Sequence, residues 1–381
     1  MKTIIIDVAP PKLSPEELGH RMDELESLVS TYWGVTIVKR VQKRTTPDYR
    51  TFIGSGKLDE LIILWEQLDA ELLIIGNIMK PSQIYNVNEY LRKAKSKVQA
   101  WDRVDLILKI FALHAVSPES KLQIELAAIK HMWPRIYGMG MELSRQGGGS
   151  KNAKGQWETN TEIMKRHLRN QEITINTKLK TYEKTRALHR ENRKRKKFPT
   201  VGIVGYTNAG KSSLFNTLTK KWVLAEDKLF ATLGTSVWKV WIDSSIWDRA
   251  SLEKVLWKKI LLNDTIGFIR DLPPDLIAAF GSTLEDSIES DLIFHVVDAA
   301  DSCIVEKIQI VDDTLKLIGA TQERYYIFNK IDSISSDDRE ILEHKFASLH
   351  PFFLSAHSYQ GIDILKASLL SYFGERSETS S

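Results

Sequence analysis

The chain has 381 residues, of which 43% are hydrophobic and 27% charged, a composition typical of a globular protein with two or three domains. Its single cysteine, Cys303, excludes an intrachain disulfide and a zinc cluster built from thiolates. The apolar run Ile4–Ile6 is too short for a secretory signal or a membrane span. We therefore expect a cytoplasmic protein without a transmembrane segment, and leave a peripheral membrane fraction open.

Positive charge is concentrated in one segment. The whole chain carries a net charge of +4, but residues 165–197 hold 13 Lys and Arg against 3 Glu, a local balance of +10. Many charge runs are only solvated helix faces, yet a surplus of this size favours a phosphate-rich partner.

Residues 1–115 alternate between strand-like and helix-like patterns. Interleaved elements of this kind indicate an open, mostly parallel α/β layer. The predicted strands are 3–8, 35–41, 72–75 and 98–101, and the predicted helices are 15–30, 57–68, 81–93 and 104–112.

Residues 116–197 predict a helical hairpin. Apolar residues recur at helical spacing in 117–134 and in 158–192, as expected for two amphipathic helices that pack together. The loop between them, 143–156, contains three successive glycines, which carry a large ordering cost and contribute no packing. We expect this loop either to be flexible or to touch a partner.

Residues 198–374 form a regular series of strand and helix patterns, followed by a polar tail at 375–381 that we expect to be disordered. Within residues 198–374, GYTNAGKS at 205–212 matches the phosphate-binding loop GxxxxGK[ST] between an apolar strand and an apolar helix. Backbone N–H groups of such a loop wrap phosphates at the helix N-terminus. Lys211 would reach the β- and γ-phosphates, and Ser212 would ligate Mg²⁺.

A P-loop alone fits ATPases, kinases and GTPases, and the base is decided by NKID at 329–332. The Asp332 carboxylate can accept hydrogen bonds from two donors that guanine presents on one edge and adenine lacks. We expect Asn329 to tie this loop to the P-loop and the Lys330 stem to lie along the base. The backbone N–H groups of 355–357 would lie near the base oxygen.

The motif DTIG at 264–267 predicts the second switch. Asp264 would lie near Mg²⁺, and the Gly267 N–H would bond the γ-phosphate until hydrolysis removes it. The next residue is Phe268, where many GTPases have a glutamine that orients the attacking water. We therefore predict slow intrinsic turnover that a partner or a bound cation accelerates.

The first switch is predicted at FATLG, residues 230–234. The Thr232 hydroxyl would complete the Mg²⁺ shell, with Thr235 as the alternative. In the P-loop, the Asn208 amide oxygen could help to hold K⁺ beside the phosphates, or Asn208 could simply stabilise the loop.

Together these motifs resemble the HflX family of translational GTPases, in the Obg–HflX superfamily, over essentially the whole chain. The most specific stretches are RTFIGSGKLDEL (50–61), KLQIELA (121–127), LSRQGGG (143–149), GYTNAGKSSLFN (205–216), LFATL (229–233), DTIGFIRDLP (264–273), STLEDS (282–287) and HVVDAAD (295–301). The resemblance implies an N-terminal α/β domain (1–115), a helical hairpin (116–197) and a Ras-like P-loop GTPase domain (198–374) with a mostly parallel sheet flanked by helices. ATP binding through the N-terminal domain, which some relatives are described as having, stays an option, although GSGK at 54–57 is better interpreted as a turn that caps a helix.

The resemblance and the motifs agree on the site. Lys211, Thr232 and Gly267 are the candidate catalytic residues, and Ser212 and Thr232 the candidate Mg²⁺ ligands. GTP or GDP would be bound by Gly205, Tyr206, Thr207, Asn208, Ala209, Gly210, Lys211, Ser212, Phe230, Ala231, Thr232, Leu233, Gly234, Asp264, Thr265, Ile266, Gly267, Asn329, Lys330, Ile331, Asp332, Ser355, Ala356 and His357.

The resemblance further implies a monomeric, Mg²⁺-dependent GTPase that binds the large ribosomal subunit through the hairpin and the basic segment and dissociates or rescues stalled ribosomes under stress. Two alternatives remain: an anti-association factor whose GTPase activity is incidental, and a GTPase of tRNA modification or of a membrane partner. Departures from the family pattern at 150–158, 233–240 and Gly281, and the long segment 241–259, leave the nucleotide motifs intact and bear on partner contacts.

Overall fold

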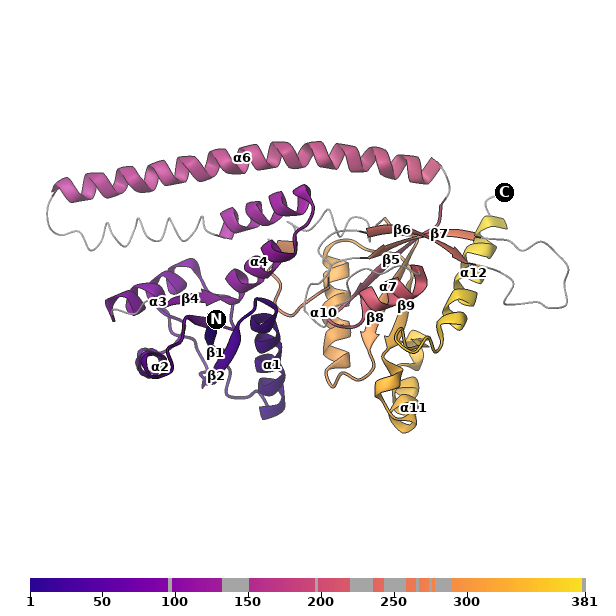
Figure 1. Cartoon of the computed structure of the whole chain (residues 1–381), viewed down its shortest axis with the longest axis horizontal. Helices are drawn as coiled ribbons and strands as arrows, with labels where there is room; N and C mark the ends of the chain where they lie inside the picture. The colour runs from indigo at the N-terminus through magenta and orange to yellow at the C-terminus, as the bar shows by residue number, and fades with distance from the viewer. Residues whose placement is uncertain are drawn as a thin grey trace. The chain divides into compact units, whose positions relative to one another are not determined.

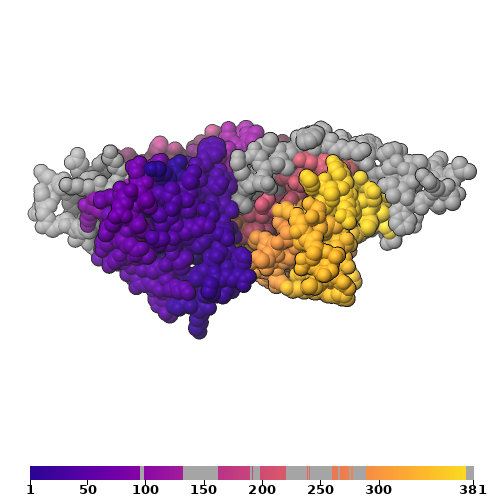
Figure 2. Space-filling model, turned by 60° about the horizontal axis from the view of Figure 1, so that its bottom comes forward, coloured from indigo at the N-terminus to yellow at the C-terminus, as the bar shows by residue number. Residues whose placement is uncertain are grey.

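The computed structural model describes residues 1–94, 98–131, 151–195, 198–219, 236–242, 258–264, 267–273, 276–277 and 289–378. The chain divides into two compact units, Met1–Tyr182 with Pro273–Ala279, and Glu183–Leu272 with Phe280–Ser381. Figure 1 labels the elements, and Figure 2 shows the described surface in colours from indigo at the N-terminus to yellow at the C-terminus. Each unit is built on its own mostly parallel sheet flanked by helices, so the predicted α/β fold is confirmed.

The N-terminal unit contains a four-stranded parallel sheet in the order β2-β1-β3-β4. Apolar side chains of α2 and α3 cover one face of this sheet, whereas α1 packs against α4. Apolar periodicity predicted both ends of all eight elements to within two residues, because each element buries apolar side chains. The elements are β1 (Lys2–Ala9), α1 (Pro15–Thr31), β2 (Val35–Lys43), α2 (Ser55–Leu68), β3 (Leu72–Ile75), α3 (Pro81–Lys93), β4 (Gln99–Asp102) and α4 (Arg103–His114).

Local side-chain chemistry fixes where these helices begin. The Ser14 hydroxyl accepts a hydrogen bond from the Glu17 N–H, while the Glu17 carboxylate accepts one from the Ser14 N–H, and α1 begins there. Asp102 and Asp105 form the same reciprocal pair at the start of α4. Helix α2 begins at Ser55, so the GSGK sequence is the start of a helix, as interpreted.

One helix of 45 residues, α6 (Lys151–Arg195), follows the described helix 118–131. Leu168 and Ile175 of α6 are buried against Leu126 and Ile129, in the contact that the helical spacing predicted.

The expected loop 143–156 is wrong for its last six residues, because α6 already begins at Lys151. Lys, Ala and Gln are good helix formers, and the single Gly155 costs only about 1 kcal/mol relative to alanine. The triple glycine within 143–149 lies outside the described residues.

The second unit contains a six-stranded sheet in the order β10-β9-β8-β5-β7-β6, parallel except for β6. Helices α7 and α12 share one apolar cluster with the sheet, and α10 and α11 contribute to another, so helices cover both faces. The elements are β5 (Thr200–Gly205), α7 (Lys211–Thr219), β6 (Ser236–Ile242), β7 (Lys258–Asp264), β8 (Leu292–Asp298), α10 (Ile304–Leu317), β9 (Arg324–Asn329), α11 (Ser336–Lys345), β10 (Phe352–Phe353) and α12 (Ile362–Glu378).

Helix α12 corrects one expectation about the C-terminus. It continues to Glu378, so residues 375–378 are helical rather than part of a disordered tail. A polar sequence is compatible with a helix as well as with disorder, so polarity alone does not distinguish the two. Within the described ranges, no helix combines the length and apolar character needed to cross a bilayer.

Candidate functional site

Four neighbouring strands of the second sheet end at the same edge, because β7, β5, β8 and β9 run parallel. The residues at these ends are Gly205 of β5, Asp264 of β7, Asp298 of β8 and Asn329 of β9. The carboxyl edge of a parallel sheet is the usual ligand-binding edge of such folds. Motifs separated by more than 120 residues in the chain are therefore brought to one place.

Three positions of the P-loop have positive φ angles, which residues other than glycine rarely adopt. Gly205 and Gly210 have φ angles of 153° and 87°, and Asn208 has a φ of 63°. A Cβ atom on Gly205 would lie 2.3 Å from the Val296 carbonyl oxygen, and one on Gly210 would lie 2.1 Å from Nδ2 of Asn329. Both glycines are thus required by close approach as well as by conformation.

Lys211 is a buried cation at the start of α7. Its Nζ donates a 2.8 Å hydrogen bond to the Tyr206 carbonyl oxygen. Burial lowers the pKa of Lys211 to about 8; Asp264 acts in the opposite direction, and the nearby charge of Lys330 lowers the pKa further. Since an unfolded lysine stays protonated to a pH near 10.5, the nucleotide-free fold gains stability as pH rises from about 8 to 10.5.

Ser212 and Asp264 place hard oxygen donors side by side. The Ser212 hydroxyl donates to Oδ2 of Asp264 at 3.3 Å, and Asp264 is fully buried. This donor set, a hydroxyl beside a carboxylate at the end of a P-loop, fits Mg²⁺, which accepts few protein oxygens and keeps several waters. Ser212 would hold the ion and Asp264 would bind its waters.

The segment after DTIG is joined to the P-loop by main-chain hydrogen bonds. The Phe268 N–H donates to the Gly205 carbonyl at 3.0 Å, and the Thr207 N–H donates to the Phe268 carbonyl at 2.8 Å. Gly267 lies beside the Lys211 ammonium, since a Cβ there would be 2.8 Å from Nζ. The phenyl ring of Phe268 is buried, with 3% exposure, and it has no group that could hydrogen-bond a water molecule.

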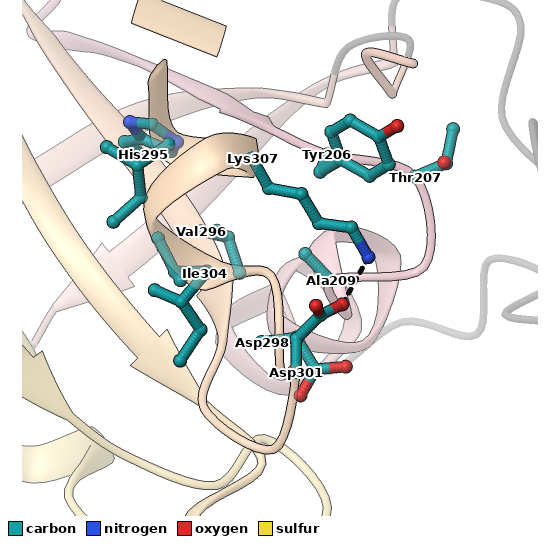
Figure 3. A pocket seen from close by; sticks show the side chains of 11 residues that line it. Tyr206, Thr207, Ala209, His295, Val296, Asp298, Asp301, Ile304 and Lys307 are labelled. Atoms are coloured by element: carbon teal, nitrogen blue, oxygen red, sulfur yellow. Dashed lines mark hydrogen bonds and ion pairs between the residues drawn. The ribbon is translucent and has the colours of Figure 1, made fainter. Parts of the chain in front are cut away.

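A narrow recess adjoins the P-loop on the side of β8 and α10 (Figure 3). The Lys307 ammonium lies 4.9 Å from the centre of the Tyr206 ring and is ion-paired with Asp301. The Tyr206 hydroxyl accepts a 2.8 Å hydrogen bond from the Arg270 N–H, and the Arg270 side chain pairs with Glu306 of α10. The recess therefore lies beside the phosphate cradle, and Tyr206 joins that cradle to the segment after DTIG.

Asn329 connects three loops through one side chain. Its Nδ2 donates to the Ala209 carbonyl at 3.1 Å, and its Oδ1 accepts from the Ala356 N–H at 2.9 Å. The expected link between NKID and the P-loop is therefore present as a hydrogen bond. The Ala356 and Ser355 N–H groups are occupied, the latter by the Gln360 carbonyl, so a contact with the base oxygen would fall to His357.

Lys330 and Asp332 are held by partners of their own. Lys330 has a φ of 66°, and its ammonium lies 2.7 Å from Oδ2 of Asp298. A hydrogen bond from Ser355 lowers the pKa of Asp332, whose carboxylate is exposed to solvent. Sequence reasoning missed Asp298, although it lies in the quoted stretch HVVDAAD; a carboxylate at the end of a strand beside the P-loop strand was the available signal.

The structure brings together the P-loop, Asp264, Gly267, 329–332 and 355–357. The predicted first switch, residues 230–234, and Thr265 and Ile266 of DTIG lie outside the described residues, and their roles stay predictions.

Comparisons with known proteins give the geometry a context. Family models match residues 19–112 (GTP-binding GTPase N-terminal), 114–193 (GTP-binding GTPase middle region) and 200–330 (50S ribosome-binding GTPase). The GTPase HflX of Caldanaerobacter subterraneus is 40% identical over 333 residues, which cover 86% of this chain and 73% of that protein. The GTPase HflX of Alkalihalophilus pseudofirmus is 41% identical over 285 residues, which cover 75% of this chain and 63% of that protein.

The chain belongs to the HflX family of GTPases. A solved structure described as a complex of SsGBP with GDP is similar over 99% of this chain and 100% of that one, with 26% identity and a TM-score of 0.51. HflX GTPases bind and hydrolyse GTP. In such a reaction Lys211 and the P-loop N–H groups would oppose the negative charge on the transferred phosphate, and Asp332 would accept hydrogen bonds from both donors of guanine.

Nucleotide binding should take up a proton in mildly alkaline solution. A phosphate beside Lys211 favours the ammonium form, so binding raises a pKa that is about 8 in the free protein. Calorimetric titration of GDP at pH 8.5, in two buffers with different ionisation enthalpies, should show uptake of about three quarters of a proton, against about a tenth at pH 7. Lys211→Arg, which stays charged, is the control and should show no such difference. Equal uptake by the wild type at both pH values would contradict the buried-cation interpretation.

Proposed function

We propose that this HflX GTPase binds the large ribosomal subunit in its GTP-bound state and dissociates or rescues stalled ribosomes under stress. GTP would hold both switch segments in the docked geometry, and hydrolysis would release the subunit. A cytoplasmic location follows from this choice of partner.

The basic face of α6 carries the proposal. Arg166, Arg169, Lys178, Lys180 and Lys184 are exposed along this helix. The apolar side of the same helix is occupied by its packing against helix 118–131, so the charged side is the one that remains for a partner. A series of exposed cations along one helix suits a nucleic-acid backbone. The matched description, 50S ribosome-binding GTPase, points to ribosomal RNA as that polyanion.

Cosedimentation with isolated large subunits should depend on nucleotide and on salt. Binding should be tightest with a non-hydrolysable GTP analogue, weaker with GDP, and should weaken as salt rises because counterions are released. Replacing Lys178, Lys180 and Lys184 together by Glu should weaken binding and lower the salt slope by about three if each cation contacts one phosphate.

Lys316→Glu, on the exposed surface of α10, is the control for a simple change of net charge and should leave binding unaltered. Wild-type affinity in the triple variant would refute an RNA-directed role of α6. If Lys211→Ala separated ribosomal subunits as well as the wild type does, the anti-association factor with incidental GTPase activity would be the better reading.

The base specificity should rest on Asp332. Asp332→Asn replaces one acceptor oxygen by a donor, which opposes the donors of guanine and suits the carbonyl of xanthine. GTP affinity should fall by roughly 2–5 kcal/mol, and the preference should shift toward xanthosine triphosphate, as measured by competition binding. Glu340→Gln, on the surface of α11, removes a carboxylate elsewhere and should change neither affinity. Unaltered selectivity in Asp332→Asn would show that another group reads the base.

Turnover is proposed to be slow and dependent on an added charge, since the buried Phe268 cannot orient water. Asn208, in a left-handed conformation and exposed within the P-loop, is the candidate to hold K⁺ near the phosphates. GTP hydrolysis in KCl should exceed that in NaCl by at least about tenfold if the cation supplies charge to the transition state. Asn208→Ala should remove the difference, and equal rates in the two salts would end this proposal.

A further inference from the structure

Three side chains that have no binding or catalytic role above converge in the N-terminal unit. Asp102 ends β4, Asp105 lies in the first turn of α4, and His131 lies on the helix 118–131 that packs against α6. One ligand atom from each of the three lies within 4.8 Å of the others.

The two carboxylates are held rigidly before any ligand arrives. The Asp105 N–H donates to Oδ1 of Asp102 at 2.8 Å, and Oδ2 of Asp105 accepts from the Asp102 N–H at 3.3 Å. This pair caps α4 and fixes both side-chain rotamers, so Oδ1 of Asp105 is left directed toward the imidazole. A preformed donor set lowers the ordering cost of binding an ion.

The distances suit a bridging ion better than a direct bond. Nε2 of His131 lies 3.4 Å from Oδ1 of Asp105 and 3.6 Å from Oδ1 of Asp102. A charge-assisted N–H···O⁻ bond is shorter, about 2.7–2.9 Å. Metal bonds of 2.0–2.2 Å in tetrahedral geometry separate neighbouring ligand atoms by about 3.3–3.6 Å. The two distances from the imidazole nitrogen to the carboxylate oxygens fall in this range.

Burial and charge point the same way. The Asp102 side chain is 0% exposed, and Asp105 and His131 are only 16% and 17% exposed. Two carboxylates this close repel each other in a poorly solvated setting, and a divalent cation compensates both. Arg103, the nearest cation in sequence, is ion-paired with Glu24.

We propose that Asp102, Asp105 and His131 bind one divalent transition-metal ion, of which Zn²⁺ fits best. Imidazole nitrogen with carboxylate oxygen is a donor set for this class, and hard Mg²⁺ prefers oxygen alone. The ion fastens the helix 118–131, the first arm of the hairpin, to the start of α4.

The test is calorimetric titration of nucleotide-free, EDTA-treated full-length protein with zinc sulfate in the presence of excess Mg²⁺. Wild type should bind one Zn²⁺ per chain. Asp105→Asn keeps an acceptor for the helix cap but loses the charge, and should weaken binding at least about tenfold; His131→Ala should abolish the site. His344→Ala, whose imidazole is 83% exposed on α11, controls for adventitious surface histidines and should bind like the wild type.

Zn²⁺ should also raise the unfolding temperature of the wild type and of His344→Ala, but not that of His131→Ala. A cooperative thermal unfolding transition in every variant would show that the N-terminal unit is folded. GDP affinity, measured in parallel, should be the same in every variant, which separates this outcome from the GTPase assignment. Absence of a stoichiometric site, or equal Zn²⁺ affinity in wild type and His131→Ala, overturns the proposal. The three groups would then form an ion-paired cluster around a protonated imidazole.

Discussion

A positive charge buried beneath the P-loop is the constraint around which the GTPase unit is arranged. Water solvates an ammonium ion far better than the protein interior does, and this loss of solvation on burial lowers the pKa of Lys211. The Tyr206 carbonyl and the charge of Asp264 compensate only part of it. A phosphate beside Lys211 would complete the compensation, so the site favours a polyanion. The free energy spent on burying the ammonium would then be recovered when nucleotide binds.

Asn329 turns this local constraint into a connected site. Its amide joins the P-loop to the loop at Ala356, and the space for it exists only because Gly210 has no side chain. Lys330 is held against Asp298 in the same region. The loops that carry the nucleotide motifs are thus positioned by one another.

The sequence predicted the fold and the nucleotide motifs well, since both rest on local patterns. Alternating apolar runs placed the ends of the N-terminal elements to within two residues. The motifs GYTNAGKS and NKID indicate phosphate binding and guanine binding because their residue types and spacing are specific to those ligands. The partners that hold those motifs were less visible. Asp298 contacts Lys330 through the parallel register of β8 and β9, which no local pattern encodes. Likewise, α6 begins at Lys151, within a polar stretch containing glycine that by local pattern alone suggests a loop.

Phe268 occupies the position at which many GTPases have a glutamine, and its surroundings differ from those of a water-orienting residue in its main-chain bonding and its burial. The main chain of Phe268 is hydrogen-bonded to Gly205 and to Thr207, which adds a short parallel pairing to the sheet beside the P-loop. Its phenyl ring is buried. Replacing Phe268 by glutamine would exchange a buried ring for a polar amide on a main chain that is held by its neighbours on both sides. Under the proposal made above, the charge that speeds hydrolysis comes from a bound cation or partner, and this residue keeps its packing role.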